Sequence, residues 1–255
     1  MSILANRIYY INSENRVSGT ASDFQYALDI PEGEKIDTCC VLALTIPKSF
    51  YLIRAGVNTV TLLANGTSFI ITMPPGNYTA NNFITVFTNL LNALAIGTFQ
   101  MSVSSITGKY TYNYTGNATG IAFQFIKPSL LGRQMGFDEV SFNHFADNTL
   151  VSANVLDFVG TNTLFLHSDM VEDSSSVLQE LYSPNTVPFG AMVYNCQFPA
   201  MYSKKMQSKA SSLFTFSLTD EHNLPVDLNG LDICITLLLY RKEDLTRLFK
   251  AIFLK

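Results

Sequence analysis

The chain has 255 residues, of which 47% are hydrophobic and 14% are charged, and its formal net charge is −4. This composition supports a large buried core, excludes a disordered chain, and argues against a protein that coats nucleic acid through a basic face. Sparse charge, together with 19 Phe and 12 Tyr, favours a subunit whose surface is covered by its neighbours.

The N-terminal part of the chain predicts strands separated by turns. Runs with apolar residues at strand spacing cover residues 7–11, 24–30, 38–46, 57–63 and 68–73. The run 38–46 is apolar on both faces, which is typical of a strand covered on two sides. Asn65-Gly66 tolerates the positive φ of a tight turn, so the runs on either side of it are predicted to form a hairpin.

A change of period predicts one amphipathic helix over residues 79–95. Its apolar stripe at helical spacing consists of Phe83, Val86, Phe87, Leu90, Leu91 and Leu94. Thr79 is the expected N-cap, and Gly97 follows the expected end. We expect this helix to pack on a β-sandwich.

The middle of the chain gives a weaker pattern. Residues 100–105 and 109–115 predict a hairpin around Thr107-Gly108, residues 121–126 a strand, and residues 129–134 a helical turn. Between Gly136 and Tyr182, short apolar clusters alternate with polar loops, and 171–176 resembles an exposed tip. We therefore expect one domain spanning 1–255, with a loop excursion or inserted lobe at 136–182.

The last strands carry the clearest pattern in the chain. Apolar residues alternate over 214–218, again over 224–228 around Asp227, and again over 231–239 around Asp232. Side chains on a strand point to opposite faces, so these runs indicate an all-β sandwich or barrel with both aspartates facing solvent. Read locally, they form a meander with turns at 219–223 and at Asn229-Gly230.

The C-terminal residues 241–255 leave strand period and predict a short basic amphipathic helix. Leu245, Leu248, Phe249, Ile252 and Phe253 form its apolar stripe, among Arg241, Lys242, Arg247, Lys250 and Lys255. Such a helix either caps its own core or docks on a partner subunit or an anionic surface.

Candidate catalytic and metal-binding residues are few. His167-Ser168-Asp169 has the residue types of a hydrolase, and Asp220-Glu221-His222-Asn223 could bind a cation, but both are read first as ordinary strand and loop sequence. Tyr110, Tyr112 and Tyr114 could stack on bases or sugars, but packing is the stronger reading. We expect no enzyme activity, no cofactor and no metal.

Processing signals are also absent from the sequence pattern. The first residues lack the apolar core of a signal peptide, and no run of 18 apolar residues predicts a membrane span. Cys39, Cys40, Cys196 and Cys234 fit neither a disulfide framework nor a zinc spacing, and we expect them to be reduced and mostly buried. Four Asn-x-Thr sequons are better explained by turn chemistry than by glycosylation.

A family resemblance spans nearly the whole chain. It rests on the joint order of five segments: Tyr10-Ile11-Asn12-Ser13 with Arg16 and Asp23-Phe24; Val41 to Tyr51; Pro75-Gly76-Asn77-Tyr78-Thr79; Leu131-Gly132 with Gly136-Phe137; and Phe216 to Asp220. In this order they resemble the penton, or minor capsid, proteins of virophages, Polinton/Maverick elements and adintoviruses.

The resemblance implies a single jelly roll, five copies of which close the icosahedral vertex of a virion among double-jelly-roll major capsid protein trimers. It also implies assembly inside the host cell, no catalysis, and a homopentamer with no direct nucleic-acid binding. In a jelly roll, the strands 214–218 and 231–240 lie in opposite sheets, and we prefer this to the meander.

Two further expectations accompany the resemblance. We hypothesise that the tail secures the vertex through Arg247, Phe249, Lys250 and Phe253. The alternative function is a receptor-binding or carbohydrate-binding β-sandwich, such as a viral fibre head or a lectin-like module, in which exposed Tyr and Asn would contact the ligand.

Overall fold

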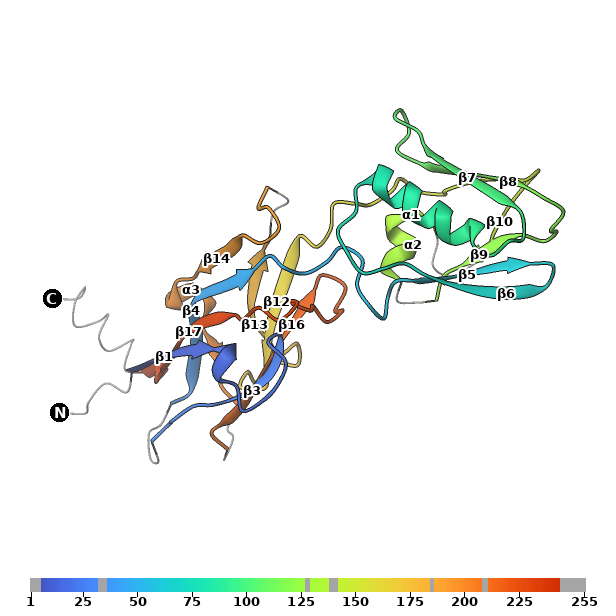
Figure 1. Cartoon of the computed structure of the whole chain (residues 1–255). Coiled ribbons are helices and arrows are strands. Elements are labelled where there is room, and N and C mark those ends of the chain that lie inside the picture. Colours follow the sequence, from blue (N-terminus) through green and yellow to red (C-terminus); the bar gives the residue numbers. More distant parts are fainter. Residues whose placement is uncertain are drawn as a thin grey trace, which may run out of the picture. The chain divides into compact units, whose positions relative to one another are not determined.

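A computed structural model describes residues 6–31, 36–126, 129–137, 142–183, 186–207 and 211–243. The chain forms two compact units, which we name the jelly-roll unit (Met1–Phe50 with Thr161–Lys255) and the inserted unit (Tyr51–Gly160). Figure 1 shows both units and labels most of their elements. This division differs from the single domain expected from the sequence, and the insertion covers 51–160 in place of the expected excursion at 136–182.

The jelly-roll unit contains most of the strands. In chain order its elements are β1 (Asn6–Asn12), η1 (Ser13–Asn15), β2 (Ser18–Gly19), β3 (Asp23–Ala27), β4 (Thr38–Pro47), β12 (Thr163–Ser168), β13 (Val177–Tyr182), β14 (Met192–Cys196), α3 (Pro199–Tyr202), β15 (Lys204–Lys205), β16 (Leu213–Asp220) and β17 (Cys234–Tyr240).

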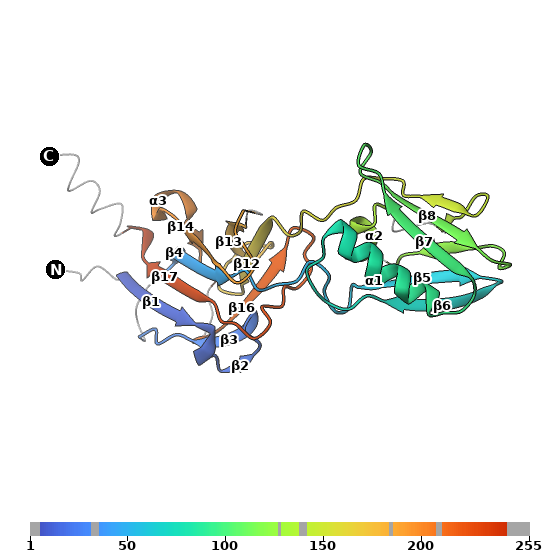
Figure 2. The ribbon, with the colours of Figure 1, turned by 45° about the horizontal axis from the view of Figure 1, so that its top comes forward.

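These strands form two antiparallel sheets. The first sheet has the order β1-β17-β4-β14, with β15 also on β4, and the second has the order β13-β12-β16-β3-β2 (Figure 2). The chain crosses repeatedly between the sheets, and β16 and β17, the last two strands, lie in different ones. This order of antiparallel strands is that of a single jelly roll, so the predicted all-β fold class is confirmed, as is the cross-sheet placement of the last strands.

The core of this unit lies between the two sheets. Alternate residues of each strand point into it, for example Ile235, Leu237 and Leu239 of β17 against Phe214 and Phe216 of β16. Each of these side chains is at most 2% exposed. Burial of a large apolar side chain stabilises a fold by roughly 1.5–3 kcal/mol, and this is what holds the sheets together.

The connection between β16 and β17 departs from the sequence prediction. Residues 224–228 form no strand, although Val226 and Leu228 are buried in the core as their alternation indicates. Asp232 is also not a simple solvent-facing position, because its carboxylate accepts a hydrogen bond from Ser13 Oγ at 2.7 Å and lies 3.4 Å from Arg16 Nη1. Alternating apolar residues therefore also occur in an extended segment that belongs to no strand and crosses from one sheet to the other.

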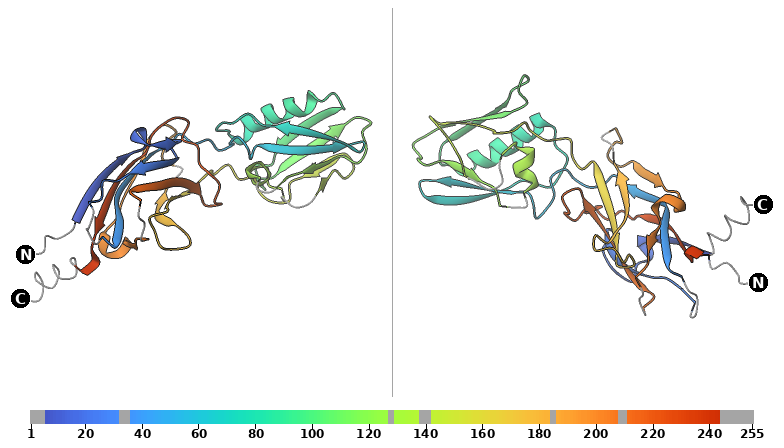
Figure 3. Two further views of the ribbon diagram at one scale, coloured as in Figure 1. Left: turned by 90° about the horizontal axis from the view of Figure 1, so that it is seen from below. Right: turned by 180° about the vertical axis from the view of Figure 1, so that it is seen from behind.

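The inserted unit has its own elements. They are β5 (Thr59–Ala64), β6 (Thr67–Thr72), α1 (Ala80–Asn92), β7 (Thr98–Val103), β8 (Tyr110–Thr115), β9 (Ala122–Gln124), α2 (Leu130–Gln134), β10 (Asn143–His144) and β11 (Thr149–Val151). One sheet has the order β10-β9-β5-β6 and the other β11-β8-β7. Figure 3 shows α1 alongside these strands.

Local signals in the inserted unit are confirmed. Thr79 caps α1 by accepting a hydrogen bond from the Asn82 N–H, and Asn65 and Gly66 have positive φ at the turn between β5 and β6. The buried face of α1 is aromatic: Phe83 stacks on Tyr110 of β8 with ring centroids 5.8 Å apart. The unit therefore has a second hydrophobic core, and this core explains why 51–160 is a separate unit.

The predicted C-terminal helix cannot be compared with the structure. The described residues end at Glu243, so Arg247, Phe249, Lys250 and Phe253 lie outside them.

Candidate interaction surface

The four long strands of the first sheet of the jelly-roll unit, β1, β17, β4 and β14, have uncharged outward side chains, and the charged residues of this sheet's short strand β15 lie beside them. Ile11, Leu44, Val193 and Ile235 point into the core, so the residues next to them on each strand point outward. These outward positions are Ile8, Tyr10, Cys40, Ala43, Thr45, Met192, Tyr194, Cys196, Cys234, Thr236 and Leu238. None of them carries a charge, which is typical of a surface that other protein covers. We call these residues the outer face.

Both lateral edges of the outer face expose large apolar side chains. On β1, Tyr10 is 77% exposed and Ile8 51%; on β14, Tyr194 is 64% exposed and Met192 54%. β1 and β14 are the two edge strands of this sheet. Edge strands offer unpaired main-chain groups, so each edge combines apolar side chains with hydrogen-bonding capacity.

One end of the outer face is covered by α3 and the residue after it. Tyr240 Oη donates a hydrogen bond to Ser203 Oγ at 2.6 Å. Burial raises the pKa of the Tyr240 phenol and of the Cys40 thiol, and raises the pKa of Cys39, which points to the core side, to about 12. These groups therefore stay protonated and take part in packing.

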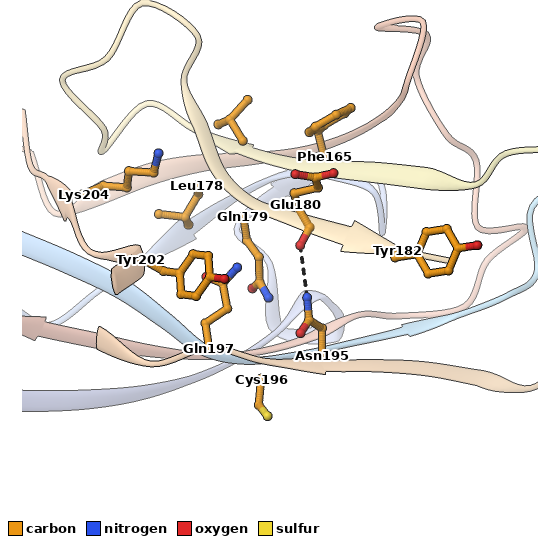
Figure 4. Close-up of a pocket in the computed structure, with 11 residues that line it drawn as sticks. Phe165, Leu178, Gln179, Glu180, Tyr182, Asn195, Cys196, Gln197, Tyr202 and Lys204 are labelled. Atoms are coloured by element: carbon orange, nitrogen blue, oxygen red, sulfur yellow. Dashed lines mark hydrogen bonds between the residues drawn. The ribbon is translucent and has the colours of Figure 1, made fainter. Parts of the chain in front are cut away.

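A cavity opens beside the β14 edge, where the two sheets approach each other. It has a volume of about 490 Å³ and is lined by Phe165, Val177, Leu178, Gln179, Glu180, Tyr182, Asn195, Cys196, Gln197, Tyr202 and Lys204 (Figure 4). We call it the flank cavity. β13 and β14, which supply most of its lining, are the edge strands of the two sheets. Asn195 Nδ2 donates to the Glu180 carbonyl at 3.1 Å and ties the two strands together.

Gln179 is the unusual residue of the flank cavity. The β12–β13 register shifts between Leu166 and His167, and Gln179 pairs with Leu166, whose side chain is in the core. The Gln179 side chain therefore lies where an apolar residue is expected. Gln179 is 2% exposed, and within the described residues neither atom of its carboxamide has a hydrogen-bond partner. Gln197 Oε1 is likewise buried without a partner.

Unpartnered buried amides are costly. Leaving a buried polar group without a hydrogen bond costs about 1–3 kcal/mol, and such groups in native proteins call for an explanation. In Figure 4 the side chains of Gln179, Gln197 and Tyr202 converge in the cavity. The flank cavity therefore offers amide donors and acceptors to an incoming group that has both.

The residues of the His167-Ser168-Asp169 tripeptide do not form a catalytic triad. Ser168 is buried on the inner face of β12, whereas its two neighbours lie on the outer side. His167 lies 2.9 Å from Thr219 Oγ1, and Asp169 accepts a hydrogen bond from the Thr215 N–H at 2.9 Å. The side chains of His167 and Asp169 therefore support the pairing of β12 with β16.

The Asp220–Asn223 segment is a turn. Asp220 is 1% exposed, and its Oδ1 accepts hydrogen bonds from the N–H groups of His222 and Leu224 at 2.8 and 2.9 Å. Asn223 adopts φ 58°, a left-handed conformation that asparagine tolerates. Within the described ranges, no three His, Cys, Asp or Glu residues lie close enough to hold a metal ion.

The three tyrosines are buried, whereas only two of the four cysteines are buried. Tyr110, Tyr112 and Tyr114 are at most 3% exposed in the inserted core, so the packing interpretation is confirmed. Cys39 and Cys40 are buried, as expected, but Cys196 and Cys234 are exposed, and none of the four forms a disulfide. Both exposed thiols belong to the outer face.

The outer face and the flank cavity were not identified from the sequence. The outward positions alternate with core positions, and this alternation was visible, but strand order was needed to show that they share one face. In the part of the chain that the structure describes, no helix has the length and apolar character needed to cross a membrane.

The comparisons with known proteins include a structural likeness. No protein-family model matches the chain, and no curated protein matches it. The crystal structure of the selenomethionine-labelled mavirus penton protein is similar over 92% of this chain and 99% of that chain, with 12% sequence identity and a TM-score of 0.40. This is a weak structural resemblance.

Proposed function

We propose that the protein is a structural capsid subunit, a homopentameric penton that closes the vertex of an icosahedral double-jelly-roll capsid. The observation that carries the proposal is the outer face: on strands β1, β4, β14 and β17 of a single jelly roll the described outward residues carry no charge, and large apolar side chains are exposed at both edges. A freely diffusing monomer rarely exposes such a surface.

Five-fold closure needs a heterologous contact, in which one flank of each subunit fits the opposite flank of the next. The first sheet provides two unlike edges. The β1 edge carries Ile8 and Tyr10, and the β14 edge carries Met192, Tyr194 and the flank cavity. This asymmetry supports a ring over a two-fold dimer, because a two-fold contact would use the same edge twice.

The sequence resemblance to penton proteins supports the same proposal. Under this proposal, the partners of the chain are further copies of itself and major capsid protein trimers, and the protein resides in the virion. Its mechanism is to fit between neighbours and not to catalyse a reaction.

The C-terminal tail is proposed to secure the vertex through Arg247, Phe249, Lys250 and Phe253. Basic and aromatic side chains together suit an anchor that combines charge with buried area. Deleting residues 243–255 should leave a folded protein that no longer enters particles, measured as vertex occupancy by cryo-electron microscopy. Normal occupancy would contradict this role of the tail.

Self-association tests the main proposal. Mass photometry and negative-stain microscopy of the purified protein should show pentamers and five-fold rings that become more abundant with concentration. A species that stays monomeric up to the solubility limit, or that forms only dimers or trimers, would contradict the penton. A monomer that also binds on a glycan array would instead support the carbohydrate-binding alternative.

A further inference from the structure

The flank cavity contains hydrogen-bonding capacity that the described chain does not use. Gln179 is 2% exposed, and the donor and the acceptor of its buried carboxamide both lack partners within the described residues. The acceptor of Gln197, Oε1, is also buried and lacks a hydrogen-bond partner within the described residues. A ligand that satisfies these groups must offer acceptors and donors side by side, as peptide main chain does.

The opposite edge of the same sheet has unpaired main-chain groups. In an antiparallel ladder, hydrogen-bonded and non-hydrogen-bonded residues alternate along each strand. The Ser13 N–H donates to the Ile233 carbonyl at 3.0 Å, and Ser13 continues the β1–β17 register. By this alternation, the main-chain groups of Ile8 and Tyr10 point away from β17. Among the described strands, β1 pairs with β17 alone.

We propose that the flank cavity receives the β1 edge of a second copy of this chain, with the carboxamides of Gln179 and Gln197 bonded to main-chain N–H and C=O groups at Ile8 and Tyr10. This inference rests on the proposed self-association and identifies the two surfaces that meet. It is a form of strand addition, in which main-chain hydrogen bonds supply affinity and side chains supply register.

The side chains around the two surfaces suit the same contact. Ile8 and Tyr10 lie on the outer face at one edge, and Met192 and Tyr194 lie on it at the other. Joining β1 of one copy to the β14 side of the next makes these residues neighbours across the contact. Each copy then uses both edges of its first sheet, which covers two of its exposed edge strands.

Gln179→Leu tests the cavity side of the contact. Leucine keeps the side chain's approximate volume and removes the unpartnered amide, so the isolated chain should unfold at the same or a higher temperature. Self-association should nevertheless weaken by about tenfold or more, measured by analytical ultracentrifugation. The matched control is Gln100→Leu, on an exposed position of β7 in the inserted unit, which should change neither property.

Tyr10→Asp tests the β1 side. A carboxylate there should oppose burial at the edge and also weaken self-association by about tenfold or more, with thermal unfolding close to that of the original protein. Ile106→Asp is its control, because Ile106 is 94% exposed in the inserted unit.

A mixture of the two variants gives the decisive result. The Gln179→Leu protein retains an intact β1 edge and the Tyr10→Asp protein an intact cavity, so together they should form one-to-one heterodimers that do not grow into rings.

Pentamers unaffected by either variant would overturn this inference and leave the proposed function in place. A wild-type chain that does not self-associate would overturn both. If Gln179→Leu lowers the unfolding temperature but leaves self-association unchanged, the amide binds an internal water molecule, and the inference is overturned.

Discussion

Ser13 joins the two ends of the jelly-roll unit: its hydroxyl donates to Asp232 Oδ1 at 2.7 Å and accepts from the Ile233 N–H at 3.0 Å. Ser13 is fully buried, and Arg16 Nη1 donates to the Ser13 carbonyl at 2.8 Å. These bonds fix the point where β1 ends beside the start of β17. Ser13 and Arg16 therefore have a structural role.

Ser13→Ala should destabilise the jelly-roll unit by about 1–3 kcal/mol, because the Ile233 N–H loses its hydroxyl acceptor and Asp232 loses a donor. Urea unfolding followed by circular dichroism measures the change. Ser18→Ala removes an exposed hydrogen bond to Gln25 and should stay within about 0.5 kcal/mol. Equal effects of the two substitutions would contradict the assigned role of Ser13.

Phe83→Ala should destabilise the inserted unit by about 3–5 kcal/mol, since it removes a fully buried ring that contacts Phe87, Tyr110 and Phe158. The two units have separate hydrophobic cores, so calorimetry should show the loss in one transition while the jelly-roll transition is retained. Phe142→Ala, at a ring that is 45% exposed, is the control and should have a much smaller effect. A uniform shift of all unfolding would contradict this separation.

Gly136→Ala and Gly66→Ala separate backbone strain from steric overlap. The two glycines have nearly equal φ, 72° and 73°, but a Cβ at Gly136 would lie 2.4 Å from the Asn154 carbonyl oxygen, whereas nothing lies within 4 Å of one at Gly66. Both variants should lose about 1 kcal/mol from the left-handed backbone, and Gly136→Ala should lose more. Thermal unfolding of the pair checks this order, and equal shifts would contradict the close contact at Gly136.

The four thiols should react with a thiol reagent in two groups. Cys196 and Cys234 are exposed in the single chain, so a thiol reagent at mildly alkaline pH should modify these two in the folded monomer and all four cysteines after denaturation. Rapid modification of Cys39 or Cys40 in the folded protein would contradict their burial.

Burial of Cys39 also predicts a pH dependence of stability. Its pKa is raised from 9.0 to about 12, so above pH 9 the unfolded chain releases this proton while the folded chain keeps it. The contribution of Cys39 to the free energy of unfolding should therefore be constant below pH 9 and fall as the pH rises toward 12. Urea unfolding of the original protein and of Cys39→Val at pH 8 and at about pH 10.5 should show a shallower fall for the variant. The same fall in both would assign the effect to Cys40 and the buried tyrosines instead.

The sequence predicted the local elements and the jelly-roll class, but not which core each element serves. The hairpin at Asn65-Gly66 and the cap at Thr79 depend on residues close in the chain, so their signals are local. The boundary at Tyr51 and Gly160 depends on which core each apolar face meets, and apolar periodicity is the same for both cores. Gln179 was missed because a bulge turned it inward, and no residue near it signals that shift.

The insertion between β4 and β12 also sets the order in which the protein can fold during synthesis. Residues 51–160 leave the ribosome before β12 to β17 exist, so the inserted unit can complete its own core first. β4 must wait for β14, β15 and β17, its partners in the first sheet, all of which are made after the inserted unit. Because β17 also pairs with β1, the jelly roll closes only once the C-terminal strand is available, and assembly of the outer face is thereby timed to the completion of the chain.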